Sequence, residues 1–497
     1  MLLTSVVKGL SYKILQGDVE REVSSIACDS RESKQNSMFV AISGFTVDGH
    51  SFIQKAMENG ATTVVVEKEV STKRDVTILQ VDNTREALAL LSANFYDHPT
   101  EELNLIGITG TNGKTSTTYF IKSIFEQAKR SIGLIGTIGT VIGDKVKKNN
   151  NTTPESLNLQ QTFQEMVHRD IKDCIMEVSS HALSLKRVAQ SAFNTGIFTN
   201  LTPDHLELHH NMDEYFEAKA ELFQLTSDFN IINADDPHGK KLIKRAKTYT
   251  PKVVTYGIKE EADIYPSDIQ YYPDHTLYKV HTPEGTIDIQ VNLPGDIYVY
   301  NSLAAIACAY CNGISLKHIQ EGIRAVEHIR GRLEVVYQER DYRIVIDFAH
   351  TEDSLEKVLS TLRPSTKGRI ILVFGVYAAP GELGSDKRKA MGRVAAEYAD
   401  FSVITSDNPK EQDPQFIVED VAKAVKEADG AFRVVVDREE AIRYAIQVSE
   451  KDDTILIAGK GHETSQIIGK EEIPFNESEI VYDALKKING TAKVKLS

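Results

Sequence analysis

The chain has 497 residues, too many for a single hydrophobic core, so we expect two to four domains. Hydrophobic residues make up 41% and charged residues 26%, as in an ordinary globular protein, and no apolar run approaches the roughly 20 residues of a membrane span. A formal charge of −14 argues against a nucleic-acid partner, and four cysteines make no disulfide framework. The N-terminus lacks the pattern of a signal peptide, so we expect a cytoplasmic protein.

The order of apolar runs predicts an N-terminal block, residues 1–98, that is a small α/β domain. Short apolar runs at 37–42, 61–66 and 76–81 predict strands, and residues 84–96 have the spacing of an amphipathic helix. A polar, proline-bearing link follows at 98–102.

A central block, residues 99–330, and a C-terminal block, residues 331–497, continue the α/β pattern. Further strands are expected at 131–134, 173–178, 195–199 and 229–233, then at 343–347, 369–374, 401–405, 433–436 and 454–458. Residues 250–295 predict inserted antiparallel strands, and Cys308 and Cys311 belong to a helix that we expect to be buried rather than metal-binding. The fold class is therefore α/β, with three domains in series, a mainly parallel central sheet around a phosphate loop and a Rossmann-like C-terminal sheet.

One stretch, Ile106-Gly-Ile-Thr-Gly-Thr-Asn-Gly-Lys-Thr-Ser-Thr-Thr118, has the features of a phosphate-binding loop. Its glycines let backbone N–H groups approach phosphate oxygens, Lys114 supplies a mobile charge, and the following helix start adds positive potential. The Thr115 hydroxyl is placed to bind Mg²⁺. Ile108 stands where the standard pattern has a glycine, but the order of strand, loop and helix still favours a nucleotide triphosphate site.

Polar residues follow the predicted strands at the ends where ligands bind in open α/β sheets. In the central block, Glu177 ends one strand and residues 200–209 follow the next, which brings a carboxylate and an imidazole near the loop as candidates for Mg²⁺ and phosphate. Lys219 belongs to a helical pattern that by itself predicts a surface lysine.

In the C-terminal block, Asp347 is a candidate for a ribose contact and Arg332 for a γ-phosphate. Asn408, Lys410 and Glu463 offer an amide, a cation and an anion. Such a set suits a zwitterionic, amino-acid-like ligand.

The motifs of all three blocks resemble those of the Mur ligases, the ATP-dependent family that builds the stem peptide of bacterial peptidoglycan. The most specific matches are Thr109-Gly-Thr-Asn-Gly-Lys-Thr115, where Ile108 is the residue expected before a Mur-type loop, and residues 177–181, 200–209, 331–332, 347–350, 407–409 and 459–463. Within the family they are most similar to the branch that adds the third residue to UDP-N-acetylmuramoyl-L-alanyl-D-glutamate. The resemblance implies that ATP converts the terminal carboxylate to an acyl phosphate, which the amino group of the incoming amino acid attacks.

The resemblance also implies residue roles. Catalytic residues would be Lys114, Lys219 and His205, with Lys219 carbamylated, because a carbamate turns a cation into an anion that can help to hold a metal. Mg²⁺ would be held by Thr115, Glu177 and His205, and ATP by Gly110, Thr111, Asn112, Gly113, Lys114, Thr115, Ser116, Asn301, Arg332 and Asp347. The N-terminal block would bind the UDP-sugar, the UDP-muramoyl peptide would be contacted by Ser30, Thr152, Thr153, Ser179 and Arg187, and the amino acid by Asn408, Lys410, Gly459 and Glu463. A monomer is expected.

The amino-acid pocket departs from the family pattern. Third-residue ligases usually carry a Gly-Asp-Arg-Asp-like loop where this chain has residues 376–387, a longer segment without the arginine. Relatives that add diaminopimelate have arginine where this chain has Lys410, and a lysine is a point charge without arginine's bidentate fork. Tyr298 and Glu352 replace a usual asparagine and proline. The sequence therefore leaves the identity of the acceptor open: it could be diaminopimelate, lysine or another amino acid.

Two alternatives accompany this interpretation: a paralogue that forms an amide outside wall synthesis, and a catalytically silent nucleotide-binding relative. Retention of Lys114, Thr115, Glu177, His205 and Lys219 argues against the silent relative. The matches at residues 29–31 and 151–154 favour a UDP-muramoyl substrate over the paralogue.

Overall fold

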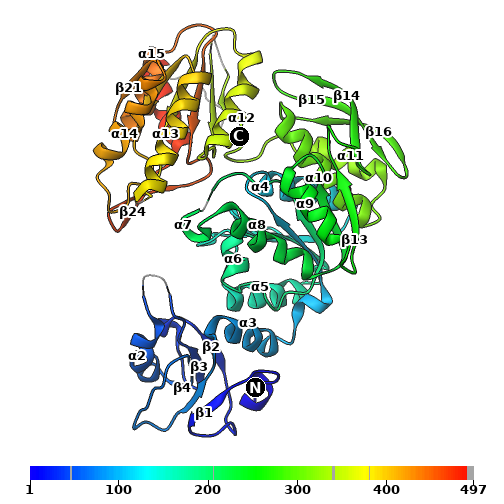
Figure 1. Cartoon of the computed structure of the whole chain (residues 1–497), viewed down its shortest axis with the longest axis vertical. Coiled ribbons are helices and arrows are strands. Elements are labelled where there is room, and N and C mark those ends of the chain that lie inside the picture. The colour runs from blue at the N-terminus through cyan, green and yellow to red at the C-terminus, as the bar shows by residue number, and fades with distance from the viewer. Residues whose placement is uncertain (45–46, 205, 339–341, 380, 490–497) are drawn as a thin grey trace.

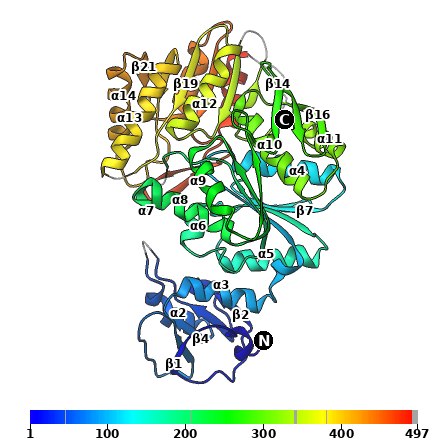
Figure 2. The same ribbon diagram turned by 45° about the vertical axis from the view of Figure 1, so that its right-hand side comes forward.

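A computed structural model describes residues 1–44, 47–204, 206–338, 342–379 and 381–489 (Figure 1). Each block builds its own main sheet, and the blocks follow one another from the bottom to the top of Figures 1 and 2. The predicted fold class, three α/β domains in series with mainly parallel sheets, is confirmed. Among the described residues, no helix is long and apolar enough to cross a bilayer.

The N-terminal block has a five-stranded sheet of order β1-β5-β4-β3-β2, in which only the β1–β5 pair is antiparallel. Its strands are β1 (Lys13–Gln16), β2 (Ser25–Ala27), β3 (Ser37–Val40), β4 (Ala61–Val66) and β5 (Thr77–Gln80). One apolar cluster joins the sheet to α1 (Leu3–Val6) and α3 (Thr84–Phe95), and another joins it to α2 (Ile53–Glu58). The short 3-10 helices η1 (Ser30–Glu32), η2 (Gly49–Phe52) and η3 (Pro99–Glu102) complete the block and its link to the next.

The central sheet has eight strands of order β13-β12-β11-β6-β10-β7-β8-β9, parallel from β13 to β7. Its inner strands are continuous apolar runs because both faces are covered. The strands are β6 (Asn104–Thr109), β7 (Ile132–Gly136), β8 (Gly139–Ile142), β9 (Lys145–Lys147), β10 (Asp173–Glu177), β11 (Phe193–Phe198), β12 (Thr226–Asn233) and β13 (Lys252–Tyr256).

Helices cover both faces of this sheet (Figure 2). One face carries α4 (Lys114–Gln127), α10 (Asp296–Cys311) and α11 (Leu316–Ala325). The other carries α5 (Ser156–His168), α6 (Ser180–Ser184), α8 (Met212–Ala220), η4 (Glu221–Gln224) and α9 (Pro237–Ala246), with α7 (Leu206–His209) before α8. Cys308 is fully buried in α10, as predicted, whereas Cys311 at the end of the helix is partly buried.

The predicted insertion divides into two parts. Its first strand, β13, pairs in parallel with β12 and so belongs to the central sheet, whereas the rest is a separate antiparallel sheet. That sheet contains β14 (Tyr265–Tyr271), β15 (Thr276–Thr282) and β16 (Gly285–Val291).

The C-terminal block has a six-stranded sheet of order β17-β18-β22-β19-β20-β21, in which only β17 is antiparallel. Its strands are β17 (Glu334–Tyr337), β18 (Arg343–Asp347), β19 (Ile370–Phe374), β20 (Phe401–Ile404), β21 (Phe432–Val434) and β22 (Thr454–Ala458), followed by the hairpin β23 (Ser465–Ile468) and β24 (Glu471–Pro474). One face carries α12 (Glu352–Leu362), α13 (Gly381–Tyr398) and α14 (Pro414–Glu427), with η5 (Arg363–Ser365) after α12. The other carries α15 (Arg438–Val448) and α16 (Glu477–Asn489).

Candidate functional site

The loop between β6 and α4 takes a shape that requires glycine at two points. Gly110 has φ +149° and Gly113 has φ +89°. A Cβ on Gly110 would collide with Thr199 Oγ1, and one on Gly113 with Asn301 Oδ1. Helix α4 starts directly after Gly113, and the first N–H groups of a helix have no partner within it. The loop therefore offers backbone donors and a positive helix end to an anion.

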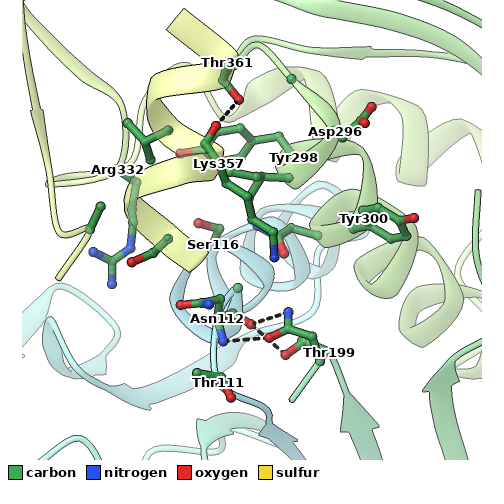
Figure 3. A pocket seen from close by; sticks show the side chains of 18 of the residues that line it. Thr111, Asn112, Ser116, Thr199, Asp296, Tyr298, Tyr300, Arg332, Lys357 and Thr361 are labelled. Atoms are coloured by element: carbon green, nitrogen blue, oxygen red, sulfur yellow. Dashed lines mark hydrogen bonds between the residues drawn. The ribbon is translucent and has the colours of Figure 1, made fainter. Parts of the chain in front are cut away.

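The segment after β11 packs against this loop and holds it in place. Thr111 N donates to Asn200 O at 2.9 Å, and Asn112 N donates to Asn200 Oδ1 at 2.9 Å. Thr199 Oγ1 donates to Asn112 O at 2.7 Å, a contact visible in Figure 3. Because two loop N–H groups are engaged by Asn200, the donors for a phosphate are those that follow, at the first turn of α4.

Two lysines donate to the same carbonyl oxygen. Lys114 Nζ donates to Gly110 O at 2.9 Å and to Thr111 O at 3.0 Å, and Lys219 Nζ donates to Gly110 O at 2.9 Å. Lys219 is only 2% exposed and lies 4.6 Å from the ring centre of Tyr215, so the surface position predicted from its helical pattern is wrong. The face of α8 that carries Lys219 is buried at the carboxyl end of β6, where Gly110 lies.

Burial shapes the protonation of both amino groups. Burial lowers the pKa of Lys114, although Glu177 and Asp204 act in the opposite direction. Burial also lowers the pKa of Lys219, well below its usual value, and the charge of Lys114 adds to the effect. Lys219 is therefore poised to be a neutral amine rather than an ammonium.

Thr115 and Glu177 place a hydroxyl and a carboxylate side by side next to the loop. Thr115 Oγ1 donates to Glu177 Oε1 at 3.0 Å, and the same carboxylate accepts from Thr137 N at 3.0 Å and Thr137 Oγ1 at 2.9 Å. Mg²⁺ commonly takes one or two protein oxygens together with substrate phosphates and water, so the pair fits this ion. His205 lies outside the described residues, and the described ones contain no group of three or more His, Cys, Asp or Glu that could hold a metal.

Residues of the C-terminal block close the other side of the loop. Arg332 Nη2 donates to Thr115 Oγ1 at 3.2 Å, and its guanidinium lies 4.7 Å from the ring centre of Phe348. Asn112 Nδ2 donates to Asp353 Oδ2 at 2.8 Å across the two blocks. The loop is thus in polar contact with both blocks.

Asp347 is buried at the end of β18. Its carboxylate accepts from Leu333 N and Ala349 N, each at 2.7 Å. Burial raises the pKa of Asp347, an effect that Arg332 and the two N–H groups reduce.

A cavity of about 950 Å³ lies between the central and C-terminal blocks (Figure 3). Most residues predicted to bind nucleotide or metal line it, together with two predicted substrate residues: Thr111, Asn112, Gly113, Lys114, Thr115, Ser116, Thr152, Glu177, Ser179, Asn301, Arg332 and Asp347. At another part of the wall are Asp296, Tyr271, Tyr272, Tyr298 and Tyr300, to which the sequence assigned no role. For Tyr271 and Tyr272, the tyrosine-rich composition of residues 250–295 was the available signal. A phosphate loop and an aromatic wall in one cavity suit a nucleotide.

The predicted substrate residues of the central block gather beside Glu177. Thr153 Oγ1 donates to Glu177 O at 2.9 Å and accepts from Ser179 N at 3.0 Å. Arg187 Nη1 donates to Thr153 O at 3.1 Å. Thr152 Oγ1 lies 3.1 Å from the Thr137 hydroxyl that also contacts Glu177.

Ser30 belongs to the N-terminal block and is not part of the group beside Glu177. Its carbonyl accepts from Asn59 Nδ2 at 2.7 Å. Helix α5 packs on the N-terminal block, with Leu157 in its apolar cluster, and Glu155 Oε2 lies 3.4 Å from both Arg85 Nη1 and Arg187 Nε.

The predicted amino-acid residues form a second cluster, in the C-terminal block. Asn408 Oδ1 accepts from Lys460 Nζ at 3.1 Å and from Ile467 N at 2.9 Å, and Asn408 Nδ2 donates to Glu463 Oε2 at 3.4 Å. Lys460 is fully buried and also donates to Glu463 Oε2 at 2.6 Å. Sequence reasoning missed Lys460, although it lies inside the motif at 459–463.

Gly459 and Lys410 flank this cluster. Gly459 has φ +119°, and a Cβ there would lie 2.9 Å from Asp407 Oδ2. Lys410 is exposed, and its backbone N donates to Ile467 O at 3.1 Å.

Comparisons with known proteins agree with this arrangement. Three family profiles match: "Mur ligase family, catalytic domain" over residues 22–96, "Mur ligase middle domain" over 108–309 and "Mur ligase, glutamate ligase domain" over 331–461. The UDP-N-acetylmuramoyl-L-alanyl-D-glutamate–2,6-diaminopimelate ligase of Clostridium perfringens is 44% identical over 490 residues, covering 98% of this chain and 100% of the relative. The enzyme of the same name from Alkaliphilus metalliredigens is 41% identical over 487 residues, 98% of each chain.

Among solved structures, one of a UDP-N-acetylmuramoyl-L-alanyl-D-glutamate–2,6-diaminopimelate ligase is 26% identical, with a TM-score of 0.69. The superposition covers 99% of this chain and 100% of that one. The likeness therefore spans all three blocks.

Proposed function

Because the chain belongs to the Mur ligase family, we propose that it joins 2,6-diaminopimelate to UDP-N-acetylmuramoyl-L-alanyl-D-glutamate. It is an ATP-dependent, ADP-forming ligase of peptidoglycan synthesis that adds the third stem-peptide amino acid. The observation that carries the choice of acceptor is the identity of 41% and 44%, over 98% of the chain, to relatives with diaminopimelate in their names. We also propose that the enzyme is cytoplasmic and monomeric.

The central block is proposed to bind ATP, with the phosphates at the loop from Gly110 to Ser116 and the base toward the tyrosines. Lys114 would exchange the two carbonyl oxygens that it now contacts for phosphate oxygens. Arg332 would add a second cation, since it already lies within hydrogen-bond distance of Thr115. Asn301 supports this role because its Nδ2 is buried and has no hydrogen-bond partner among the described residues.

Mg²⁺ is proposed to be held by Thr115 and Glu177, and by His205, the residue that the family resemblance implies. The bound ion would supply positive charge against the phosphates. Thr137 keeps the Glu177 carboxylate oriented through two hydrogen bonds, so this ligand is positioned before the ion arrives.

Lys219 is proposed to be carbamylated. A neutral amine attacks the carbon of CO₂, a C–N bond forms, and the nitrogen loses a proton to leave an anionic carbamate. The buried, low-pKa amino group of Lys219 suits this reaction. The carbamate would also attract the ammonium of Lys114, which lies close to Lys219 because both Nζ atoms donate to Gly110 O.

In the proposed reaction, the substrate carboxylate attacks the γ-phosphorus and ADP leaves. The neutral amino group of the acceptor then attacks the acyl carbon, the C–O bond to phosphate breaks, and the nitrogen loses a proton to give the amide. Thr152, Thr153, Ser179 and Arg187 would position the dipeptide end, since they gather beside Glu177. The N-terminal block, with Ser30, would bind the UDP-sugar.

The amino acid is proposed to bind at Asn408, Lys410, Gly459 and Glu463. Lys460 acts as a positioning residue, because its buried ammonium holds both Asn408 Oδ1 and Glu463 Oε2. The cluster thus presents an oriented amide and carboxylate to the acceptor.

Phosphate release by the purified protein tests the proposal. The reaction contains ATP, Mg²⁺, UDP-muramoyl dipeptide and one amino acid from a panel that includes diaminopimelate and lysine. We expect release with diaminopimelate only when all components are present. Release without any amino acid, or no turnover with the whole panel, would contradict the ligase function, and turnover with another acceptor alone would replace diaminopimelate.

A further inference from the structure

Helix α10 forms part of the wall of the large cavity, and two of its residues continue that wall beyond the phosphate loop. Asn301 lies against the loop, since a Cβ on Gly113 would be 2.3 Å from its Oδ1. Tyr298 precedes Asn301 by three residues, and residues three apart in a helix share a face. The rise of an α-helix separates the two by about 4.5 Å along the axis. Both line the cavity, so Tyr298 is one turn of helix from the contact with the loop.

The hydroxyl of Tyr298 differs from those of the other tyrosines in the cavity wall. Tyr256, Tyr271, Tyr272 and Tyr300 each donate to a neighbouring oxygen of the protein. Tyr298 is 3% exposed, yet its hydroxyl makes no hydrogen bond with the described residues. A buried hydroxyl without a partner is unfavourable, so this position favours a ligand that brings a hydrogen-bond acceptor.

The surroundings of this hydroxyl keep it a donor. Burial raises the pKa of Tyr298 well above its usual value, Asp347 raises it further, and Arg332 opposes the effect. The hydroxyl therefore stays protonated at neutral pH, in the neighbourhood of one carboxylate and one guanidinium. Tyr298 and Arg332 lie on the upper part of the cavity wall in Figure 3, and Thr111 and Asn112 of the loop on the lower part.

Asp347 supplies the complementary acceptor. Its two carboxylate oxygens each accept one backbone N–H, from Ala349 and from Leu333, and each oxygen has a further lone pair. A hydroxyl group satisfies both side chains at once, because it can donate to Asp347 and accept from Tyr298. In a nucleotide the hydroxyls belong to the ribose, whereas the phosphate oxygens carry negative charge that Asp347 would repel.

The family pattern has an asparagine where this chain has Tyr298. A tyrosine carries its donor at the far end of a ring, whereas the amide of an asparagine lies close to the helix. The reach of the hydroxyl toward Asp347 is therefore a feature of this chain rather than of the family pattern.

We propose that the hydroxyl of Tyr298 donates a hydrogen bond to a ribose hydroxyl of the bound nucleotide, and that the same ribose hydroxyl donates to Asp347. Tyr298 then selects ribonucleotides over deoxyribonucleotides. This inference rests on the nucleotide site of the proposed function, and it adds a sugar contact from a residue to which the sequence assigned no role.

Isothermal titration calorimetry of the full-length enzyme with ADP, 2′-deoxyADP and 3′-deoxyADP, each with Mg²⁺, tests the contact without turnover. Wild type should bind the deoxy nucleotide that lacks the contacted hydroxyl at least about five-fold more weakly than ADP. Tyr298→Phe keeps the ring and removes only the hydroxyl, so its Kd for ADP should rise about five-fold, the loss of one neutral hydrogen bond. Its Kd for that deoxy nucleotide should change less than about two-fold, because the bond is already missing.

Tyr310→Phe is the matched control, because Tyr310 belongs to the same helix and does not line the cavity that the described residues form. We expect its Kd values for all three nucleotides to equal those of wild type. Equal wild-type affinity for the three nucleotides, an unchanged Kd of Tyr298→Phe for ADP, or equal weakening of all three by this variant overturns the inference and leaves the proposed function standing. Wild-type protein that binds none of the three would contradict the nucleotide site, and the proposed function with it.

Discussion

Replacing Lys114 by alanine should abolish turnover and leave the protein folded. The variant loses hydrogen bonds from Nζ to Gly110 O and Thr111 O, each worth about 1.5–3 kcal/mol for a charged donor. It also removes a buried cation, whose desolvation cost is evident from the lowered pKa of Lys114. The opposing effects should leave the free energy of unfolding within about 2 kcal/mol of wild type. Turnover should fall at least about 100-fold, because a preorganised charge at the phosphates is lost.

Urea unfolding measures the stability change, and phosphate release at saturating substrates measures turnover. Lys122→Ala is the matched control on the same helix, where Lys122 forms a part-exposed pair with Glu126. Such pairs contribute at most about 1 kcal/mol, so the control should keep both stability and activity. Activity retained by Lys114→Ala would refute the phosphate-loop assignment, and loss of the folded state would show that the lysine is mainly structural.

Three further substitutions probe other parts of the site. Gly113→Ala, at φ +89° and against Asn301, should raise the KM for ATP at least about ten-fold in steady-state assays, and an unchanged KM would contradict nucleotide binding there. Burial, with Arg332 nearby, lowers the pKa of His462 to about 3, so the folded state binds fewer protons than the unfolded chain below about pH 6.5. Stability should therefore fall by about 2 kcal/mol from pH 7 to pH 5, and urea unfolding of His462→Gln should lack this loss. Lys410→Ala should mainly raise the KM of the amino acid, and an unchanged KM would show that the pocket lies elsewhere.

Buried strands were predictable from the sequence, whereas most edge strands were not: β21 was expected at 433–436, but β9 and β17 were not expected. β6 and β10 are apolar runs because parallel strands covered on both faces need no alternation. β9 is exposed at all three positions and carries two lysines, so its pairing with β8 had no hydrophobic signal. β13 was placed in the insertion because its pairing with β12 depends on topology rather than on local pattern.

Motifs predicted which residues gather at the phosphate loop. They did not predict which side chains are buried or which residues form contacts between the blocks. In the sequence, Lys219 was indistinguishable from a surface lysine, because whether its face of the helix is buried depends on what packs against that helix. The bond between Asn112 and Asp353 joins residues 241 positions apart, and nothing local to either residue predicts it. The same holds for Arg388, whose burial follows from the packing of α13 on α14.

Activation of the carboxylate and choice of the amine are proposed to reside on different blocks, which are joined by several polar contacts. Lys387 Nζ lies 3.6 Å from Asp204 Oδ1, Asn112 Nδ2 donates to Asp353 Oδ2 at 2.8 Å, and Arg332 Nη2 donates to Thr115 Oγ1 at 3.2 Å. An acceptor bound to the C-terminal block must also reach the acyl phosphate held by the central block. Acceptor binding should therefore strengthen the contact between the blocks, so that the correct amine favours the arrangement in which the acyl phosphate is attacked.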